Sequence, residues 1–193
     1  MLTRRHALWA APVAVVGAGA GLSGWMLLRR PTRASGIGGP FTLVDGSGKT
    51  VTDSSFRGKW MLIYFGYTHC PDACPTALQD MANALDMLDP AQRKSVVIVF
   101  ITVDGERDTP AVMQDYVSNF AAPIVALSGS AEQIAAAAKA YRVYYGKHPT
   151  ADGGYEMDHS SVIYVMNPDG DFVANFTHET APARIAEKMR QLL

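Results

Sequence analysis

Cysteine is scarce in this chain, because its 193 residues contain only two, Cys70 and Cys74. Small secreted domains that depend on disulfides for their stability are rich in cysteine, so this sequence is not a disulfide scaffold. Hydrophobic residues make up 48% of the chain, which is enough to form a core in a single domain of this length. The two cysteines are therefore candidates for chemistry rather than for architecture.

An excess of positive charge is also missing. The formal net charge is −1, and outside residues 1–30 the acidic residues outnumber the basic ones. Domains that bind nucleic acid normally present a basic face to the phosphate backbone. We therefore expect no nucleic acid among the partners of this protein.

Charged residues are absent from residues 7–28, a run of 22 residues. As a helix this run would be about 33 Å long, which matches the hydrocarbon thickness of a bilayer. Trp9 and Trp25 lie near its ends and arginines flank both sides, as is typical of membrane spans, although the arginines leave the orientation open. We predict a transmembrane anchor in residues 1–30, with a cleaved signal peptide as the alternative. A flexible linker, residues 31–40, would then precede one exported domain, residues 41–193.

Strand-like and helical patterns alternate along this domain. Residues 60–67 and 96–103 are continuous apolar runs typical of buried strands, and a helical periodicity between them ends near Pro90. Further helices are predicted after Pro110, from Ser130 to Tyr141 and at the C-terminus, and hairpins at residues 41–51 and 161–176. This order predicts an α/β, thioredoxin-like fold with a central mixed sheet flanked by helices.

Cys70 and Cys74 fall between the strand at residues 60–67 and the next helix, whose N-terminus would favour their thiolate forms. Pro75 predicts that Cys74 lies at the helix cap and Cys70 in the loop before it. A thiolate is both a nucleophile and a soft metal ligand, so the spacing alone leaves disulfide exchange and metal binding open. Two sulfurs select Cu(I) or zinc, and a trigonal copper site needs one further donor, typically an imidazole.

His159 is the favoured third donor. It lies in Asp158-His159-Ser160, just before the strand predicted at residue 161, and in a thioredoxin-like fold this segment would abut the helix start that carries the cysteines. The competing interpretation is a hydrogen-bonded loop histidine. Of the other four histidines, His6 lies in the anchor and His69 in an exposed loop beside Cys70. We expect His148 in a surface loop, and His178 as a surface residue or a cap of the last helix.

Other polar or soft side chains near these motifs have more than one interpretation each. Asp72 either modulates the charge of the sulfurs or forms a turn, and Met157 is either a soft donor or, as we expect, a packing residue. Residues 103–109 form a charged loop that either closes over the metal site, contacts a partner or, by default, is solvated and salt-bridged. Its charged members are Asp104, Glu106, Arg107 and Asp108.

Three segments resemble the motifs of the Sco/SenC copper proteins. They are Gly-Tyr-Thr-His-Cys-Pro-Asp-Ala-Cys-Pro at residues 66–75, Thr-Val-Asp-Gly-Glu-Arg-Asp-Thr-Pro at residues 102–110, and Asp-His-Ser at residues 158–160. The resemblance implies a thioredoxin-like domain tethered to a membrane through residues 7–28 and facing the periplasm or intermembrane space. It implies a copper ion, Cu(I) or Cu(II), held by Cys70, Cys74 and His159. Asp104 is carried over as a motif residue with a role in metal transfer, whereas Gly105 departs from the family's usual proline and loosens that loop.

The same resemblance implies a copper chaperone that helps to assemble the binuclear copper site of cytochrome c oxidase, by copper delivery, by thiol reduction or by both. Its partners would be the copper-receiving subunit of the oxidase and other copper chaperones or thiol reductants. We expect a metallochaperone rather than an enzyme. The alternative is a thiol-disulfide oxidoreductase or redox sensor using Cys70 and Cys74, although thioredoxins have two residues between their cysteines where this chain has three. A peroxiredoxin-type peroxidase is disfavoured, because no arginine stands near Cys70 in the sequence.

Overall fold

The structure is a computed structural model that describes residues 36–193. The predicted anchor and the first half of the predicted linker lie outside the described residues. Within residues 36–193, no helix has both the length and the apolar composition that a membrane crossing requires.

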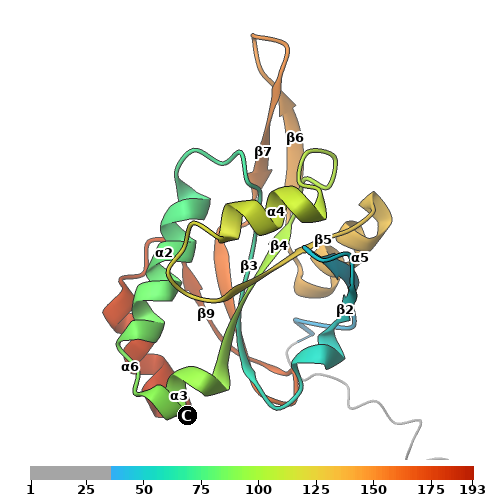
Figure 1. Ribbon diagram of the computed structural model, residues 1–193. Helices are drawn as coiled ribbons and strands as arrows, with labels where there is room; N and C mark the ends of the chain where they lie inside the picture. Colours follow the sequence, from blue (N-terminus) through green and yellow to red (C-terminus); the bar gives the residue numbers. More distant parts are fainter. Residues whose placement is uncertain (1–35) are drawn as a thin grey trace, which may run out of the picture. The chain divides into compact units, whose positions relative to one another are not determined.

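Fifteen helices and strands follow one another in the described part of the chain (Figure 1). In chain order they are β1 (Thr42–Asp45), β2 (Thr50–Thr52), the 3-10 helix η1 (Asp53–Phe56), β3 (Trp60–Gly66), α2 (Ala73–Asp86), α3 (Pro90–Ser95), β4 (Val96–Thr102), α4 (Pro110–Val117), β5 (Ile124–Ser128), α5 (Ala131–Tyr141), β6 (Tyr145–Pro149), β7 (Tyr155–His159), β8 (Val162–Met166), β9 (Phe172–Thr177) and α6 (Pro182–Leu192).

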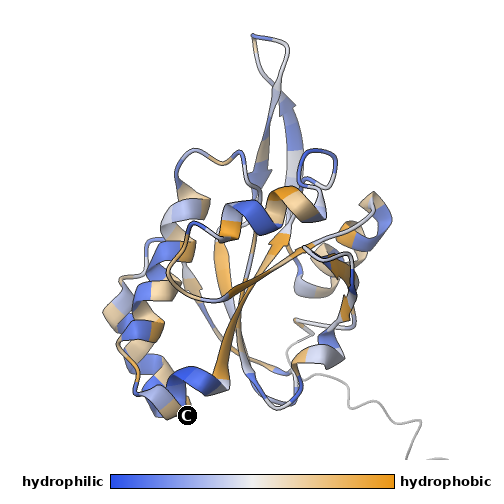
Figure 2. Cartoon of the chain, viewed as in Figure 1, coloured by the Kyte–Doolittle hydropathy of each residue, from blue (hydrophilic) through white to orange (hydrophobic). Residues whose placement is uncertain are grey.

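Seven strands form the main sheet, in the order β2-β1-β5-β4-β3-β8-β9. Strands β3, β4 and β5 are parallel to one another, whereas β1 and β8 pair antiparallel with their neighbours. The two central strands are almost entirely buried, which explains their continuous apolar sequences (Figure 2). The predicted α/β class with a central mixed sheet flanked by helices is therefore confirmed.

Successive residues of β3 point to opposite faces of the sheet and contact different helices. Tyr64 stacks on Phe100 with ring centroids 6.4 Å apart, and Phe100 meets Tyr116 of α4 at 5.8 Å. On the other face, the Phe65 ring lies 5.4 Å from the ring of Tyr141 in α5. Gly66, two residues after Tyr64, lies on the same face of the sheet as Tyr64, and a Cβ atom there would lie 2.6 Å from the Cys74 sulfur of α2. Helix α2 therefore covers the Tyr64 face.

Several elements differ from the sequence-based expectations. Pro90 opens the short helix α3 instead of only ending the preceding one, because Asp89 forms a capping box with Gln92. Strand β5 was not expected, and neither was the hairpin β6–β7, whose exposed residues carry little hydrophobic alternation. The helix predicted from Ser130 to Tyr141 is confirmed, with Ser130 as its N-cap in a capping box with Gln133, and so is the hairpin predicted at residues 161–176.

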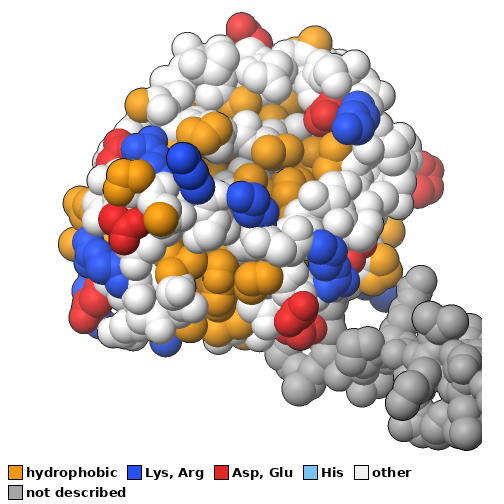
Figure 3. All heavy atoms as spheres, turned by 60° about the horizontal axis from the view of Figure 1, so that its bottom comes forward, with side chains coloured by type: hydrophobic (Ala, Val, Ile, Leu, Met, Phe, Trp, Pro, Cys, Tyr) orange, Lys and Arg blue, Asp and Glu red, His pale blue; other side chains and the backbone are white. Residues whose placement is uncertain are grey.

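The hairpin β6–β7 forms a separate two-stranded sheet that projects from one end of the main sheet (Figure 1). Its register pairs Tyr145 with His159 at the base and Pro149 with Tyr155 near the tip. His159, the histidine predicted as a ligand, therefore lies at the base of the projecting hairpin. At the opposite end of the domain, basic side chains lie around hydrophobic patches (Figure 3).

Candidate metal centre

The two cysteines lie where β3 gives way to α2. Helix α2 begins at Ala73 with Asp72 at the N-cap position, so the prediction that Cys74 occupies the cap is wrong. Cys74 lies instead in the first helical turn, because a proline such as Pro75 fits there without breaking a helical hydrogen bond. Cys74 is buried, Cys70 is half-buried in the preceding loop, and both are free thiols.

His159 ends strand β7 and faces the cysteines. Its Nε2 atom lies 3.5 Å from the Cys74 sulfur, and its Nδ1 atom lies 3.3 Å from the Ser160 carbonyl oxygen. The rings of Tyr64 and Tyr67 meet the imidazole edge-on, each with centroids 5.9 Å apart. These contacts fix the imidazole between two aromatic walls with one nitrogen directed at sulfur.

The three predicted donors form one group. One ligand atom from each of Cys70, Cys74 and His159 lies within 4.8 Å of the other two. Three ligands at about 2.2 Å from a trigonal ion are about 3.8 Å apart, so a small movement would close this group around a metal. Two sulfurs and one imidazole are soft or borderline donors, which suits Cu(I) and also zinc.

The two thiols differ in acidity because they share one hydrogen bond. The Cys74 thiol donates to the Cys70 sulfur, and this is the main reason that the pKa of Cys70 falls to about 3, with further hydrogen bonds from His159 and backbone groups. The same hydrogen bond raises the pKa of Cys74, and burial and the nearby Cys70 charge add to the increase. In the metal-free protein, Cys70 is therefore the thiolate and Cys74 the neutral thiol.

This asymmetry predicts an unusual pH dependence of alkylation. Because the pKa of Cys70 is lowered from 9.0 to about 3, its thiolate persists between pH 7 and pH 5 and is lost only as the pH approaches 3. The rate of iodoacetamide modification of Cys70 should change by less than about threefold over that range, whereas an ordinary thiol would slow by about 100-fold. Peptide mass spectrometry can follow each cysteine separately; a 100-fold decrease at Cys70 would contradict the assignment.

Gly66 provides the space for the Cys74 sulfur, a role that no sequence pattern indicated. A Cβ atom at Gly66 would lie 2.6 Å from the Cys74 Sγ atom and 3.0 Å from the Phe100 ring. Both neighbours are fully buried. The absence of a side chain at the end of β3 therefore allows the first turn of α2 to bring its thiol against the sheet.

Replacing Gly66 by alanine should displace the Cys74 sulfur and lower copper affinity by about 10–100-fold, the range seen when the support of a metal ligand is removed. Gly66 is not among the glycines with positive φ, so alanine fits its backbone and the effect is steric. Gly154→Ala in the exposed hairpin loop is the control. Competition with a Cu(I) chelator measures both variants, and an unchanged affinity in Gly66→Ala would show that the sulfur position is not critical.

The charged loop, residues 103–109, is not the solvated loop expected by default. Asp104 and Asp108 are 3% and 0% exposed. Asp108 accepts hydrogen bonds from the Thr68 backbone N–H at 3.0 Å, the Thr68 hydroxyl at 2.6 Å and the Thr102 hydroxyl at 2.7 Å. Asp108 thereby anchors the cysteine loop, a contact that sequence reasoning missed because it joins residues 40 positions apart.

The Asp104 carboxylate accepts hydrogen bonds from Arg107 and from the Tyr155 hydroxyl. Gly105 is closely packed, since a Cβ there would lie 2.5 Å from the Ile134 side chain and 2.8 Å from the Gly129 carbonyl oxygen. The expectation that Gly105 loosens this loop is therefore not supported by its packing.

The remaining predicted residues lie outside the three-donor group. His69 is exposed and contacts Thr68 and Asp108, as expected for a loop histidine. His148 is exposed, but it belongs to β6 rather than to a loop, and it lies 2.7 Å from Asp158. Met157 is 8% exposed and packs in the core, which confirms its structural role. His178 is half-buried, and Ala181 rather than His178 is the N-cap residue of α6.

Known proteins are similar to this chain both in sequence and in fold. A family model described as SCO1/SenC matches residues 29–193. "Protein SCO1 homolog 1, mitochondrial" of Arabidopsis thaliana is 47% identical over 137 residues, which cover 71% of this chain but only 41% of that protein, so the chain spans less than half the length of this relative.

Solved structures of Sco proteins are similar to this chain in fold as well. ScoI of Bradyrhizobium japonicum with copper bound is 47% identical, with a TM-score of 0.75 over 81% of this chain and 99% of that one. BsSco, described as having a disulfide switch and as a member of the Sco family of cytochrome c oxidase assembly proteins, is 26% identical, with a TM-score of 0.62 over 79% and 91%. The thioredoxin-like α/β fold predicted from the sequence agrees with these likenesses. The chain belongs to the SCO1/SenC family.

Proposed function

We propose that this protein carries one copper ion, held by the Cys70 and Cys74 sulfurs and the His159 imidazole. The observation that carries the proposal is the convergence of these three donors within 4.8 Å. The soft donor set supports copper as the ion. The copper bound to the Bradyrhizobium japonicum relative supports the same conclusion.

Copper is the cargo in this proposal, and the acidity of the thiols determines how it is loaded. Cys70 is already ionised, so binding must displace the proton of Cys74. Cys74 is buried, whereas Cys70 is half-buried. Acceptor thiols would therefore approach first from the Cys70 side, and Cys74 would regain its proton as the ion leaves.

The proposed acceptor is the copper-receiving subunit of cytochrome c oxidase, whose binuclear copper site this protein would help to assemble by copper delivery, by thiol reduction, or by both. Support comes from BsSco, which is described as a member of a family of oxidase assembly proteins. Other copper chaperones or thiol reductants would load or reduce the cysteine pair.

The proposal includes a membrane tether. The uncharged residues 7–28 would anchor the chain, residues 31–40 would act as a linker, and residues 41–193 would face the periplasm, the equivalent of the intermembrane space. The mitochondrial name of the Arabidopsis thaliana relative supports a location outside the cytosol.

Membranes from a deletion strain test this function. We expect low oxidase activity and low oxidase copper, restored by the wild-type gene but not by a gene encoding His159→Ala. Restoration by added copper alone would favour delivery, and restoration by a thiol reductant alone would favour reduction of the acceptor. Normal oxidase activity in the deletion strain would contradict the proposal.

A thiol-disulfide oxidoreductase is the second candidate, favoured by the lowered pKa of Cys70 beside a second free thiol. An insulin-reduction assay distinguishes the two functions. Rapid turnover by a protein that fails to bind copper would favour this candidate over the carrier.

A further inference from the structure

The hairpin that carries His159 is not part of the main sheet. Among the strands of residues 36–193, β6 and β7 pair only with each other, so the ladder hydrogen bonds do not fix the hairpin against β3 and α2. At its base, the Ser160 N–H donates to the Tyr144 carbonyl at 2.9 Å, and the Tyr144 N–H donates to the Ser160 hydroxyl at 3.0 Å. These bonds close the hairpin on itself. The position of His159 is therefore set by its chain connection to β8, which begins at Val162, and by side-chain contacts between the hairpin and the rest of the domain.

Arg107 makes the most extensive of these contacts. Its guanidinium carbon lies 3.7 Å from the centroid of the Tyr155 ring, well within the range of a cation–π interaction. Its NH1 group donates to the Tyr155 carbonyl at 2.9 Å, and its Nε group donates to the Asp104 carboxylate. Arg107 thus binds both the side chain and the backbone of the first residue of β7.

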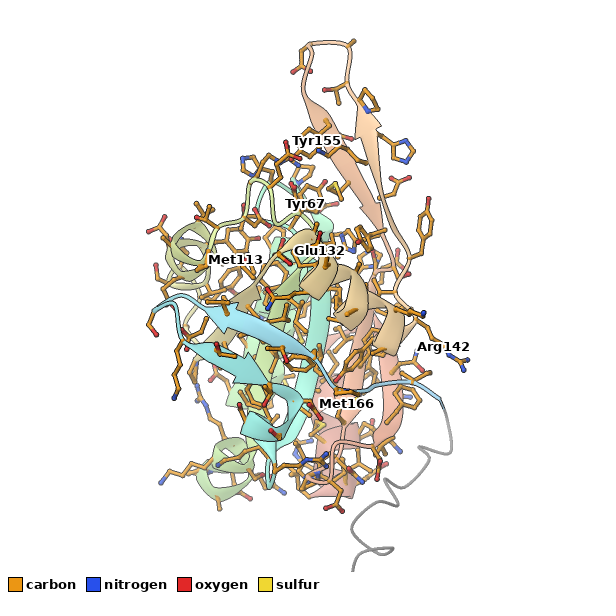
Figure 4. All side chains as sticks on the ribbon, turned by 90° about the vertical axis from the view of Figure 1, so that its right-hand side faces the viewer. Tyr67, Met113, Glu132, Arg142, Tyr155 and Met166 are labelled. Carbon is orange, nitrogen blue, oxygen red and sulfur yellow. The ribbon has the colours of Figure 1, made fainter. Side chains whose placement is uncertain are left out.

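Further contacts enclose the same tyrosine. The Tyr155 hydroxyl donates to Asp104 at 2.9 Å, and the Lys147 amino group lies 3.8 Å from the Tyr155 ring and pairs with Glu106. Figure 4 shows Tyr155 on the hairpin and Tyr67 on the adjoining end of the domain. The Arg107 guanidinium is also 5.8 Å from the Tyr67 ring, which forms one of the walls around His159.

The charged loop therefore joins the two halves of the three-donor group. Asp108 holds Thr68, two residues before Cys70, whereas Arg107 holds Tyr155, four residues before His159. A strand rises about 3.3 Å per residue and keeps its side chains in fixed directions, so holding one end of β7 restricts the other. Only 23% of the Arg107 side chain is exposed, which favours a structural contact over an interaction with solvent.

We propose that Arg107 is a positioning residue for metal binding: by holding Tyr155, it keeps β7 where the His159 imidazole faces the two cysteine sulfurs. This inference rests on the proposed function, since it assumes that these three residues hold copper. In the described part of the chain, the hydrogen bonds and ring contacts of Arg107 go to Asp104, Tyr155 and Tyr67 rather than to any of the three donors. Its effect on copper should therefore be exerted entirely through His159.

A double-mutant cycle on the full-length chain, purified in detergent, tests this coupling. The variants are Arg107→Gln, His159→Ala and the double variant, and Arg184→Gln is the control, because it breaks an exposed ion pair on α6. Arg107→Gln should lower Cu(I) affinity, measured by chelator competition, by about 10–100-fold. In the His159→Ala background, the same change should alter affinity by less than about twofold.

X-ray absorption at the copper edge provides a second readout. Copper bound to Arg107→Gln should keep its sulfur scattering but lose imidazole scattering, which a general loss of stability would not produce. If Arg107→Gln does not fold, Tyr155→Leu removes the contact from the other side and should give the same spectrum and the same non-additivity.

The outcomes distinguish the positioning role of Arg107 from the proposed copper donors. Wild-type affinity in Arg107→Gln, or an equal loss with and without His159, would overturn the positioning role while leaving the copper site intact. Equal copper affinity in the wild type and in His159→Ala would instead overturn the proposed donor set, and the positioning role with it.

Discussion

Replacing Cys74 by serine should lower the copper affinity of the full-length chain by about 100–1,000-fold. Structural metal sites with four ligands contribute about 10–16 kcal/mol, so one ligand is worth about 2.5–4 kcal/mol, which corresponds to about two to three orders of magnitude in affinity. The Cys74 sulfur lies 3.5 Å from His159 Nε2 and is buried, so serine would put a hard, neutral oxygen in the place of a soft thiolate. Chelator competition under reducing conditions gives the affinity, and metal analysis gives the copper content.

A matched control is available on the same helix. Thr76 is exposed one half-turn beyond Cys74, and Thr76→Ala should bind copper as the wild type does. Cys70→Ser should resemble Cys74→Ser, since both sulfurs belong to the same group. Wild-type affinity in either cysteine variant would show that copper binds elsewhere in the chain.

Oxidation of the cysteine pair should abolish copper uptake altogether. Both residues are free thiols, and their sulfurs lie close enough for the Cys74 thiol to donate a hydrogen bond to Cys70. A disulfide would remove both thiolates at once, because copper binding requires deprotonated sulfur. Treatment with diamide, followed by desalting and copper loading, should therefore give a chain without copper, and dithiothreitol should restore full uptake.

The control for oxidation is the Cys70→Ser variant, which cannot form the disulfide and should show the same low copper uptake before and after diamide. Thiol titration verifies that the wild-type pair has been oxidised. An oxidised wild-type chain that takes up copper as well as the reduced chain would mean that the two sulfurs are not ligands.

The three proposed donors could be found from the sequence because each lies next to a strong local signal. Cys70 and Cys74 lie between a continuous apolar strand and a run with clear helical periodicity, and His159 lies three residues before the apolar strand β8. The α/β class followed from the same apolar runs, since strands buried on both faces leave an unmistakable pattern.

The supports of the donors could not be found in this way, because they depend on contacts between distant residues. The bond from Arg107 to Tyr155 joins positions 48 apart, and that from Thr68 to Asp108 joins positions 40 apart. The hairpin β6–β7 was missed because its strands are largely exposed and lack the alternation of a half-buried strand. Gly66 matters for the side chain it lacks, which only the packing reveals.

X-ray absorption of the copper-loaded, reduced, full-length chain tests the central claim most directly. We predict one copper ion per chain with two sulfur ligands and one imidazole nitrogen, the nitrogen disappearing in His159→Ala. A copper ion without imidazole in the wild type, or an unchanged spectrum in His159→Ala, would contradict the assignment of Cys70, Cys74 and His159 as the copper site.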